Sequence, residues 1–399
     1  MNTDKKLNYT CIFVHGMYGW GENEGINKYI PYWGVTNGSV TEYLTSIGCE
    51  SYAASVGPAS SAWDRACELY AQLTGTWVDY GKAHSAKRGH KQFGRNYEKP
   101  LIEKWDAENK IHLIGHSFGG TTVRMLTHLL THGASEEVEA SGENVSPLFK
   151  GGKGDWVCSL TAICSPLNGT SAHDTVVRYH LKNVLRFGTY LYTGGLGRSP
   201  LNGKLVDFHL EQFGLTNTPG MKDSESFAKA VKIINASDDH VEYDMSPEGS
   251  KLINERIKIS PQVCYFSYPY NSVKESKSGK THLPSYTKFP FLSLTSALMT
   301  NDMKRHIDEG DNTERIYNDG LVDTFSATHP HTEPYCLWEE TENVRPGVWH
   351  VMPITQGDHG SAIGLFESKE VTTKFYSLIT DVLVLAEETV KNKKEIHKF

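Results

Sequence analysis

The segment 115–119 has the residue types of a serine nucleophile held on a sharp turn. Ser117 lies in a Gly-x-Ser-x-Gly pattern, directly after the apolar run Ile111–Ile114 and before a helical pattern. A strand-to-helix turn of this kind exposes the serine hydroxyl, and its small residues let two backbones pass close together. The backbone N–H of Phe118 would then lie at a helix N-terminus, where it can stabilise a developing oxyanion. Because the pentapeptide also recurs by chance, the alternative is that Ser117 is only a small turn residue.

A serine nucleophile needs a general base and a carboxylate that orients the base, and two downstream motifs can supply them. Asp319 lies in an Asn-Asp-Gly turn before an apolar pair, and His359 lies in a Gly-Asp-His-Gly loop after an apolar strand. Taken alone, Asp319 would be an ordinary turn aspartate. His359 alone would be a solvated loop histidine, and three others compete with it: His329, His331 and His350. The order Ser, Asp, His along the chain favours the catalytic interpretation, because serine hydrolases with this turn have that order.

Short apolar runs alternate with helical patterns, which predicts an α/β fold with a mostly parallel, doubly wound sheet and helices on both faces. The predicted strands are 9–14, 51–56, 110–114, 156–163, 262–267 and 349–353, and the clearest helical patterns are 121–131 and 371–390. Reactive residues of such a sheet belong on loops at the carboxyl ends of the strands. The region of about residues 170–250 includes amphipathic patterns interrupted by glycines, which favours an inserted cap. No linker divides the chain, so we expect one domain over residues 1–399.

The composition excludes several functional classes. The 399 residues carry a formal net charge of −7 and no basic stripe, which argues against a nucleic-acid partner. No apolar run approaches the roughly 20 residues of a membrane span. The N-terminus lacks the apolar segment of a signal peptide, so we expect either a secreted protein without its leader or a cytosolic one. The seven cysteines are odd in number and scattered, which predicts no disulfide framework.

Asp64, His84 and His90 lie in one short stretch and have side chains that could ligate a metal ion. Their spacing is a weak signal, because it lacks the His-Glu-x-x-His or paired Cys-x-x-Cys pattern. On spacing alone, a polar surface loop is the better interpretation of these residues.

Beyond these motifs, the chain resembles true-lipase family I.5, the thermoalkalophilic, zinc-containing lipases of Geobacillus and Staphylococcus type. The resemblance covers about residues 8–385 and is most specific in 56–73 and 78–84, then at Lys87, Gly89-His90 and Phe93–Arg95. It implies an α/β-hydrolase fold. It also implies that Ser117 is the nucleophile, His359 the base and Asp319 the orienting carboxylate.

The same resemblance implies an oxyanion hole formed by the backbone N–H groups of Met17 and Phe118. The family usually has an aromatic residue at the position of Met17 and a glutamine at that of Phe118. Because the donors are main-chain groups, we expect the hole to be retained and the acyl pocket to be reshaped.

A structural zinc ion is also implied, held by two aspartates and two histidines: Asp64, His84, His90 and Asp244. Four protein ligands fill a tetrahedral shell and leave no position for a reacting water. We therefore expect zinc to tie an insertion at about 58–98 to the segment around Asp244. The family also binds calcium through acidic residues after the catalytic histidine. The matching stretch 360–366 has none, so we predict calcium to be absent or weak, with Glu367 as a partial substitute.

These inferences predict a serine carboxylic-ester hydrolase that works through an acyl-enzyme. The resemblance implies a triacylglycerol lipase whose cap opens at a lipid surface. The predicted cap stretch 180–195 is less continuously apolar than a strong interfacial helix. That leaves open a general carboxylesterase or a polyester hydrolase. Two more distant alternatives are a zinc-dependent metallohydrolase and an inactive binding module.

Overall fold

A sheet of seven strands organises the computed structural model, which describes residues 6–179, 207, 209–213, 232, 236–276, 282–308, 316–338 and 343–396. The strand order is β11-β12-β7-β6-β5-β1-β2, and all neighbouring strands run parallel. The bounds are β1 (Thr10–Val14), β2 (Ser51–Ala54), β5 (Ile111–His116), β6 (Val157–Ile163), β7 (Cys264–Tyr268), β11 (Tyr335–Leu337) and β12 (Trp349–Val351). After β1 the chain forms β2 at one edge of the sheet. It then returns to the other side of β1 to form β5, and β6 and β7 follow in order. The opposite edge is formed by β11, and β12 lies between β11 and β7. The predicted doubly wound α/β sheet is confirmed.

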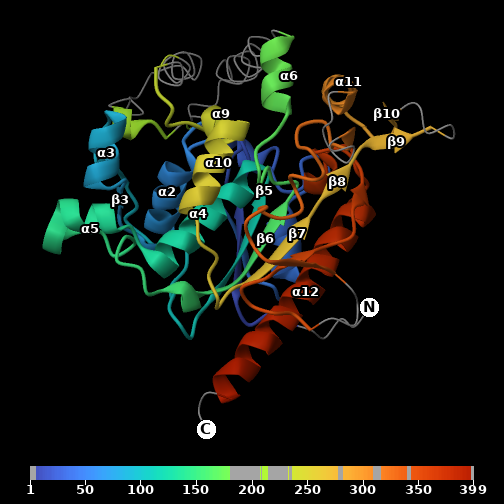
Figure 1. Cartoon of the computed structure of the whole chain (residues 1–399). Helices are drawn as coiled ribbons and strands as arrows, with labels where there is room; N and C mark the ends of the chain where they lie inside the picture. Colours follow the sequence, from blue (N-terminus) through green and yellow to red (C-terminus); the bar gives the residue numbers. More distant parts are fainter. Residues whose placement is uncertain are drawn as a thin grey trace.

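Helices cover both faces of the sheet, as Figure 1 shows. The alternation of side chains along β1 separates the two cores, because successive residues of a strand point to opposite faces. Ile12 and Val14 belong to the core shared with α2 (Ala62–Thr74) and α4 (Phe118–His132). Cys11 and Phe13 belong to the core under the other helical layer, which includes α1 (Val40–Ser46) and α12 (Lys369–Ile396).

Shorter elements lie around this frame. The remaining helices include α3 (Lys82–Arg88), α5 (Ser135–Ser141), α6 (Ala172–Arg178), α9 (Val241–Asp244), α10 (Pro247–Arg256) and α11 (Pro290–Asp308). Small two-stranded pairs are formed by β3 (Trp77–Asp79) with β4 (Phe93–Asn96), β8 (Tyr270–Asn271) with β13 (Thr355–Gln356), and β9 (Val273–Glu275) with β10 (His282–Pro284). In the described ranges, no helix combines the length and apolar character that crossing a bilayer requires.

All six predicted strands are present, and the two helical patterns fall within α4 and α12. Within the seven-stranded sheet, the strand that the sequence did not indicate is β11, at one edge. It has three residues, and its two outer ones are exposed. A strand of only three residues is too short to show the pattern from which a strand is recognised.

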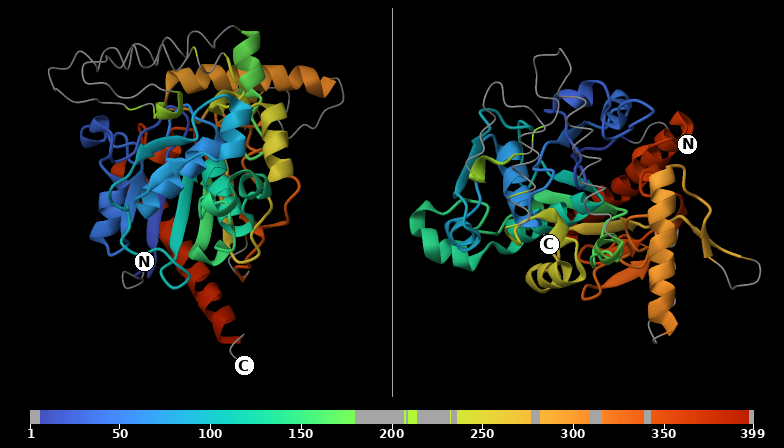
Figure 2. Two further views of the ribbon diagram at one scale, coloured as in Figure 1. Left: turned by 90° about the vertical axis from the view of Figure 1, so that its left-hand side faces the viewer. Right: turned by 90° about the horizontal axis from the view of Figure 1, so that it is seen from above.

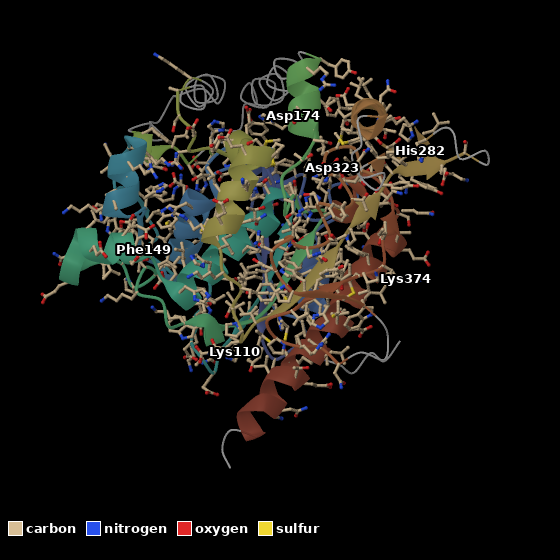
Figure 3. The ribbon with its side chains drawn as sticks, in the orientation of Figure 1. Lys110, Phe149, Asp174, His282, Asp323 and Lys374 are labelled. Atoms are coloured by element: carbon tan, nitrogen blue, oxygen red, sulfur yellow. The ribbon has the colours of Figure 1, made fainter. Side chains whose placement is uncertain are left out.

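The carboxyl ends of the strands face the end of the molecule from which α6 extends (Figures 1 and 2). In Figure 3, Lys110, just before β5, lies near the lower end, and Asp323 lies near the opposite, upper end. Asp323 fixes the start of α6, because its carboxylate accepts hydrogen bonds from Ser171 N at 2.7 Å and Ser171 Oγ at 2.5 Å. Most of the predicted cap, including 180–195, lies outside the described residues. Its described parts include α6, 209–213 and 236–250.

Candidate active site and metal cluster

Ser117 is held in a strained turn between β5 and α4. Its backbone has φ 56° and ψ −131°, a conformation that residues with a side chain rarely adopt. Its N–H donates to Ile163 O at 2.8 Å. A Cβ added to Gly115 would collide with the backbone of Gly119, and one added to Gly119 would collide with Val14 O. The close packing therefore requires both glycines of the motif, and the turn has the geometry of a nucleophile elbow.

His359 and Asp319 come from separate loops and form a hydrogen-bonded pair. His359 Nδ1 lies 2.8 Å from Asp319 Oδ2, and His359 N donates to Asp319 O at 2.9 Å. Asp319 Oδ1 accepts from the backbone N–H groups of Leu321 and Val322 at 2.9 and 2.8 Å, which fixes the carboxylate. With Nδ1–H donated to Asp319, Nε2 is the ring nitrogen that can accept a proton.

The three competing histidines lie in other environments. His350 is buried in β12, where its Nε2 accepts from Arg345 N at 3.1 Å. His329 stacks on Tyr335 with ring centroids 3.7 Å apart, and His331 is exposed. His359 is therefore the histidine that the structure pairs with Asp319.

His116 connects the nucleophile turn to the loop of the base. It precedes Ser117 and is buried, with its ring centroid 4.7 Å from that of His359. Tyr32 Oη lies 2.7 Å from His116 Nδ1 and accepts from Gly16 N at 2.9 Å, so its own proton goes to His116. The other nitrogen, Nε2, then donates to His359 O at 3.0 Å. Burial and the nearby His359 lower the pKa of His116 well below its usual value, which keeps this chain of hydrogen bonds neutral. The sequence analysis missed His116 and Tyr32.

Cys164 is a further residue that the sequence analysis did not assign to the site. It is fully buried after β6, and its thiol lies close to the Asp319 carboxylate. Burial, followed by the negative charge of Asp319, raises the pKa of Cys164 well above its usual value. The thiol therefore stays protonated beside the carboxylate that orients His359.

Replacing Cys164 with alanine should lower kcat about 10-fold, because Asp319 loses the protonated thiol beside it and keeps two backbone N–H groups and His359. Cys164→Ser retains an O–H donor and should stay within about 3-fold of the unmodified protein. The measurement is kcat/KM for a p-nitrophenyl ester across pH 5–9. Equal losses in both variants would mean that packing, and not the hydrogen bond, is what Cys164 supplies.

The two predicted oxyanion donors lie on either side of Ser117. Phe118 is the first residue of α4, and the first N–H groups of a helix have no partner within it. Met17 follows Gly16, and a Cβ added to Gly16 would lie 2.7 Å from the Cβ of Ser117. The segment that carries the Met17 amide therefore passes directly beside the nucleophile. This placement supports the predicted hole.

Backbone strain gathers around these residues. Among the described residues, those with positive φ that are not glycine are Tyr18, Ser117, Cys164, His209 and Phe366. Tyr18 adjoins Met17, and Cys164 contacts Asp319. Such conformations cost of order 1–3 kcal/mol each and persist where the surrounding structure holds them.

Four side chains form a separate cluster that could hold a metal ion: Asp64, His84, His90 and Asp239. Their potential ligand atoms all lie within 4.8 Å of one another. His84 Nε2 is 3.2 Å from both Asp64 Oδ1 and Asp239 Oδ2, and His90 Nε2 is 3.1 Å from Asp239 Oδ2. Nevertheless, Asp64 Oδ1 and His84 Nε2 are buried and have no hydrogen-bond partner. Burial and the neighbouring Asp239 raise the pKa of Asp64, a sign of excess negative charge that a dication would neutralise. Two imidazoles and two carboxylates suit zinc.

The fourth carboxylate of this cluster is Asp239 and not the predicted Asp244. An antiparallel bridge between Ser60 and His240 brings Asp239 beside the start of α2. Asp244 instead turns toward the backbone, where its Oδ2 accepts from Ala62 N at 2.7 Å.

A cavity of about 500 Å³ opens beside the metal cluster. Its lining includes His84 and Asp239 together with Trp63, Tyr243 and Arg256, and it does not include Ser117. The guanidinium carbon of Arg256 lies 4.8 Å from the centre of the Trp63 ring, which in turn stacks on His84 at 5.0 Å. This cavity gives solvent access to the cluster and is not an acyl-binding site.

The loop after His359 bears on the calcium prediction. The Asp358 carboxylate accepts from the backbone N–H groups of Lys288, Gly360 and Ser361. Glu367, the expected substitute ligand, pairs with the Lys288 ammonium. Both carboxylates thus have protein partners, and a weak or absent calcium site stays a prediction.

Comparison with known proteins places the chain in a family. Residues 7–394 match the family described as "Lipase-like, C-terminal domain". The chain belongs to this family. "Lipase 2" of Staphylococcus aureus is 32% identical over 391 residues, which cover 94% of this chain and 54% of that protein. A lipase of Staphylococcus epidermidis is 32% identical over 403 residues, covering 98% and 55%. The chain thus spans about half the length of the curated relatives it matches.

Solved structures of similar proteins agree with this placement. Staphylococcus hyicus lipase superposes with a TM-score of 0.77 at 32% identity, covering 98% of this chain and 99% of that one. EstA from Clostridium botulinum gives a TM-score of 0.76 at 32% identity, covering 97% and 88%. The resemblance to family I.5 lipases is confirmed, and so is the α/β-hydrolase fold.

Proposed function

We propose that this chain hydrolyses carboxylic esters through a covalent acyl-enzyme. The observation that carries the proposal is the 2.8 Å contact between His359 Nδ1 and Asp319 Oδ2, tied through His116 to the turn that holds Ser117. A serine on such a turn, with a histidine already oriented by a carboxylate, is the constellation of nucleophilic acyl transfer. Membership of a lipase-like family supports the same reaction.

In the proposed reaction, His359 Nε2 takes the Ser117 proton as the serine oxygen attacks the ester carbonyl. The N–H groups of Met17 and Phe118 stabilise the resulting oxyanion. Asp319 stabilises the imidazolium, which then protonates the leaving alcohol. Water, activated by His359, cleaves the acyl-enzyme by the same route and restores the serine.

We propose a structural role for zinc at the cluster of Asp64, His84, His90 and Asp239. Two nitrogen and two oxygen donors fill a tetrahedral shell, so the ion would add folding free energy and supply no reactive water. The cluster ties α2 and α3 to the segment that contains Asp239. A zinc-dependent hydrolase is therefore the less favoured hypothesis for this site.

Three substrate classes fit an ester hydrolase of this family: long-chain acylglycerols, short soluble esters and polyesters. A triacylglycerol lipase is the first candidate, because the relatives named above are called lipases. If the chain is a triacylglycerol lipase, we expect it to make transient contact with a lipid surface.

The test is a substrate panel combined with labelling of the nucleophile. Hydrolysis of p-nitrophenyl butyrate, emulsified long-chain triglyceride and a polyester film is measured before and after reaction with a serine-directed phosphonate. We expect one phosphonate per chain, located on Ser117 by mass spectrometry, and loss of all three activities. The relative rates then assign the substrate class.

Two other outcomes would each contradict the proposal. Activity that survives full labelling of Ser117 but disappears at once with a chelator would identify a metallohydrolase. A folded protein that hydrolyses none of the three substrates would be an inactive binding module.

A further inference from the structure

Arg65 lies next to the metal cluster in sequence but points toward the catalytic turn. It follows Asp64 on α2 and has no solvent exposure. Its Nε donates to Thr122 Oγ1 at 2.8 Å, and its Nη1 donates to Gly57 O at 3.1 Å. Nη2 donates to His15 O, and Nη1 also lies 3.5 Å from Gly16 O. The planar fork of one guanidinium thus binds three different segments of the chain.

Two of those segments carry the proposed oxyanion donors. His15 and Gly16 directly precede Met17, so Arg65 fixes the carbonyls beside the first donor. Thr122 lies one turn after Phe118, and its hydroxyl donates to Phe118 O at 3.1 Å. The guanidinium carbon also lies 5.3 Å from the centre of the Phe118 ring. The Arg65 side chain therefore contacts residues that position both the Met17 and the Phe118 amides.

Arg65 is hydrogen-bonded to dipoles, and the charge of the Glu68 carboxylate acts on it without a hydrogen bond. In the part of the chain that the structure describes, its hydrogen bonds go to carbonyl and hydroxyl oxygens. Glu68, one turn along α2, has its oxygens taken up by Gly57 N and by Tyr80 Oη at 3.1 Å. Arginine stays protonated at neutral pH, so Arg65 is a buried cation. A buried cation acts strongly on nearby charge, because little water screens it.

We propose that Arg65 is the positioning residue of the oxyanion hole: it holds the Met17 and Phe118 amides at a fixed separation and adds a buried positive charge beside the developing oxyanion. This inference rests on the proposed ester hydrolysis. Preorganised dipoles and charges act where negative charge develops, so their loss lowers kcat more than it raises KM.

The test compares two substitutions of Arg65 with a control at another buried arginine. Arg65→Lys keeps the charge and loses the fork, whereas Arg65→Met loses both. Arg124, on α4, serves as the control because it is buried like Arg65. Its guanidinium pairs instead with Glu333 at 2.7 Å and with Asn254 at 3.0 Å. Each protein is assayed for kcat and KM on p-nitrophenyl butyrate, per active site titrated with a phosphonate. Melting temperature and affinity for a boronic acid, which mimics the tetrahedral oxyanion, are measured alongside.

We expect kcat per active site to fall about 10-fold in Arg65→Lys and about 10²–10³-fold in Arg65→Met, with KM within about 2-fold. Boronic acid affinity should fall in parallel with kcat. Arg124→Met should lower the melting temperature but keep kcat per active site. A purely structural role for Arg65 would give equal kcat per active site in all variants, and that result would overturn the inference. If the unmodified protein has no esterase activity at all, it is the proposed function that fails.

Discussion

Ser117→Ala should lower kcat for ester hydrolysis by about 10⁶-fold and leave the fold intact. The variant removes the attacking oxygen, and water cannot replace it at a comparable rate. Alanine has the same Cβ as serine, so the strained φ of 56° is no harder to adopt. The Ser117 N–H to Ile163 O bond at 2.8 Å is also retained. The melting temperature should therefore change by no more than about 2 °C.

The measurement is kcat on p-nitrophenyl butyrate, with circular dichroism and thermal melting of the same samples. Ser165→Ala is the matched control, because Ser165 is fully buried near the same rim and its hydroxyl donates to Ile163 O at 3.3 Å. We expect that variant to keep activity within about 5-fold, since it removes one neutral hydrogen bond. Substantial turnover by Ser117→Ala would reject the acyl-enzyme mechanism.

Asp239→Asn should abolish the proposed zinc binding and lower stability, while Asp244→Asn should do neither. An amide is a poor zinc ligand, so Asp239→Asn leaves only three ligands of the proposed set: Asp64, His84 and His90. Binding at 100–1,000 times Kd adds about 2.7–4.1 kcal/mol to the free energy of unfolding, and this is what the variant should lose. Asparagine at position 244 can still accept from Ala62 N through its side-chain oxygen.

Zinc content and calorimetric melting, each with and without a chelator, test this pair. The chelator should lower the melting temperature of the unmodified protein and of Asp244→Asn. It should have no effect on Asp239→Asn, which has no metal to lose. Zinc retained by Asp239→Asn and lost by Asp244→Asn would restore the ligand set inferred from the sequence.

Local patterns account for what the sequence predicted well. Buried strands produce apolar runs, and the elbow requires small residues at Gly115 and Gly119. Both features can be recognised within a few consecutive residues of the sequence. The pairing of His359 with Asp319 was inferred from the order of motifs, and the contact at 2.8 Å supports it. The choice of Ser117 as nucleophile stays a prediction until it is tested.

The missed residues act through long-range contacts that no local pattern reveals. Asp239 reaches the cluster only because a bridge joins Ser60 to His240, and the family resemblance had instead implied Asp244. Arg65 lies in an ordinary helix, and its role depends on carbonyls of two other segments. Cys164 follows an apolar strand, where a cysteine is expected to be core.

The unusual backbone conformations at Tyr18, Ser117 and Cys164 set limits on how this protein can be stabilised. The chain gives up conformational free energy at these three positions in order to hold its reactive groups in place. Glycine at position 117 would relieve the backbone strain but remove the nucleophile, so stability gained there would be lost as activity. Thermostable variants should therefore be sought on the outer faces of α1 and α12, far from the turns that bear the strain.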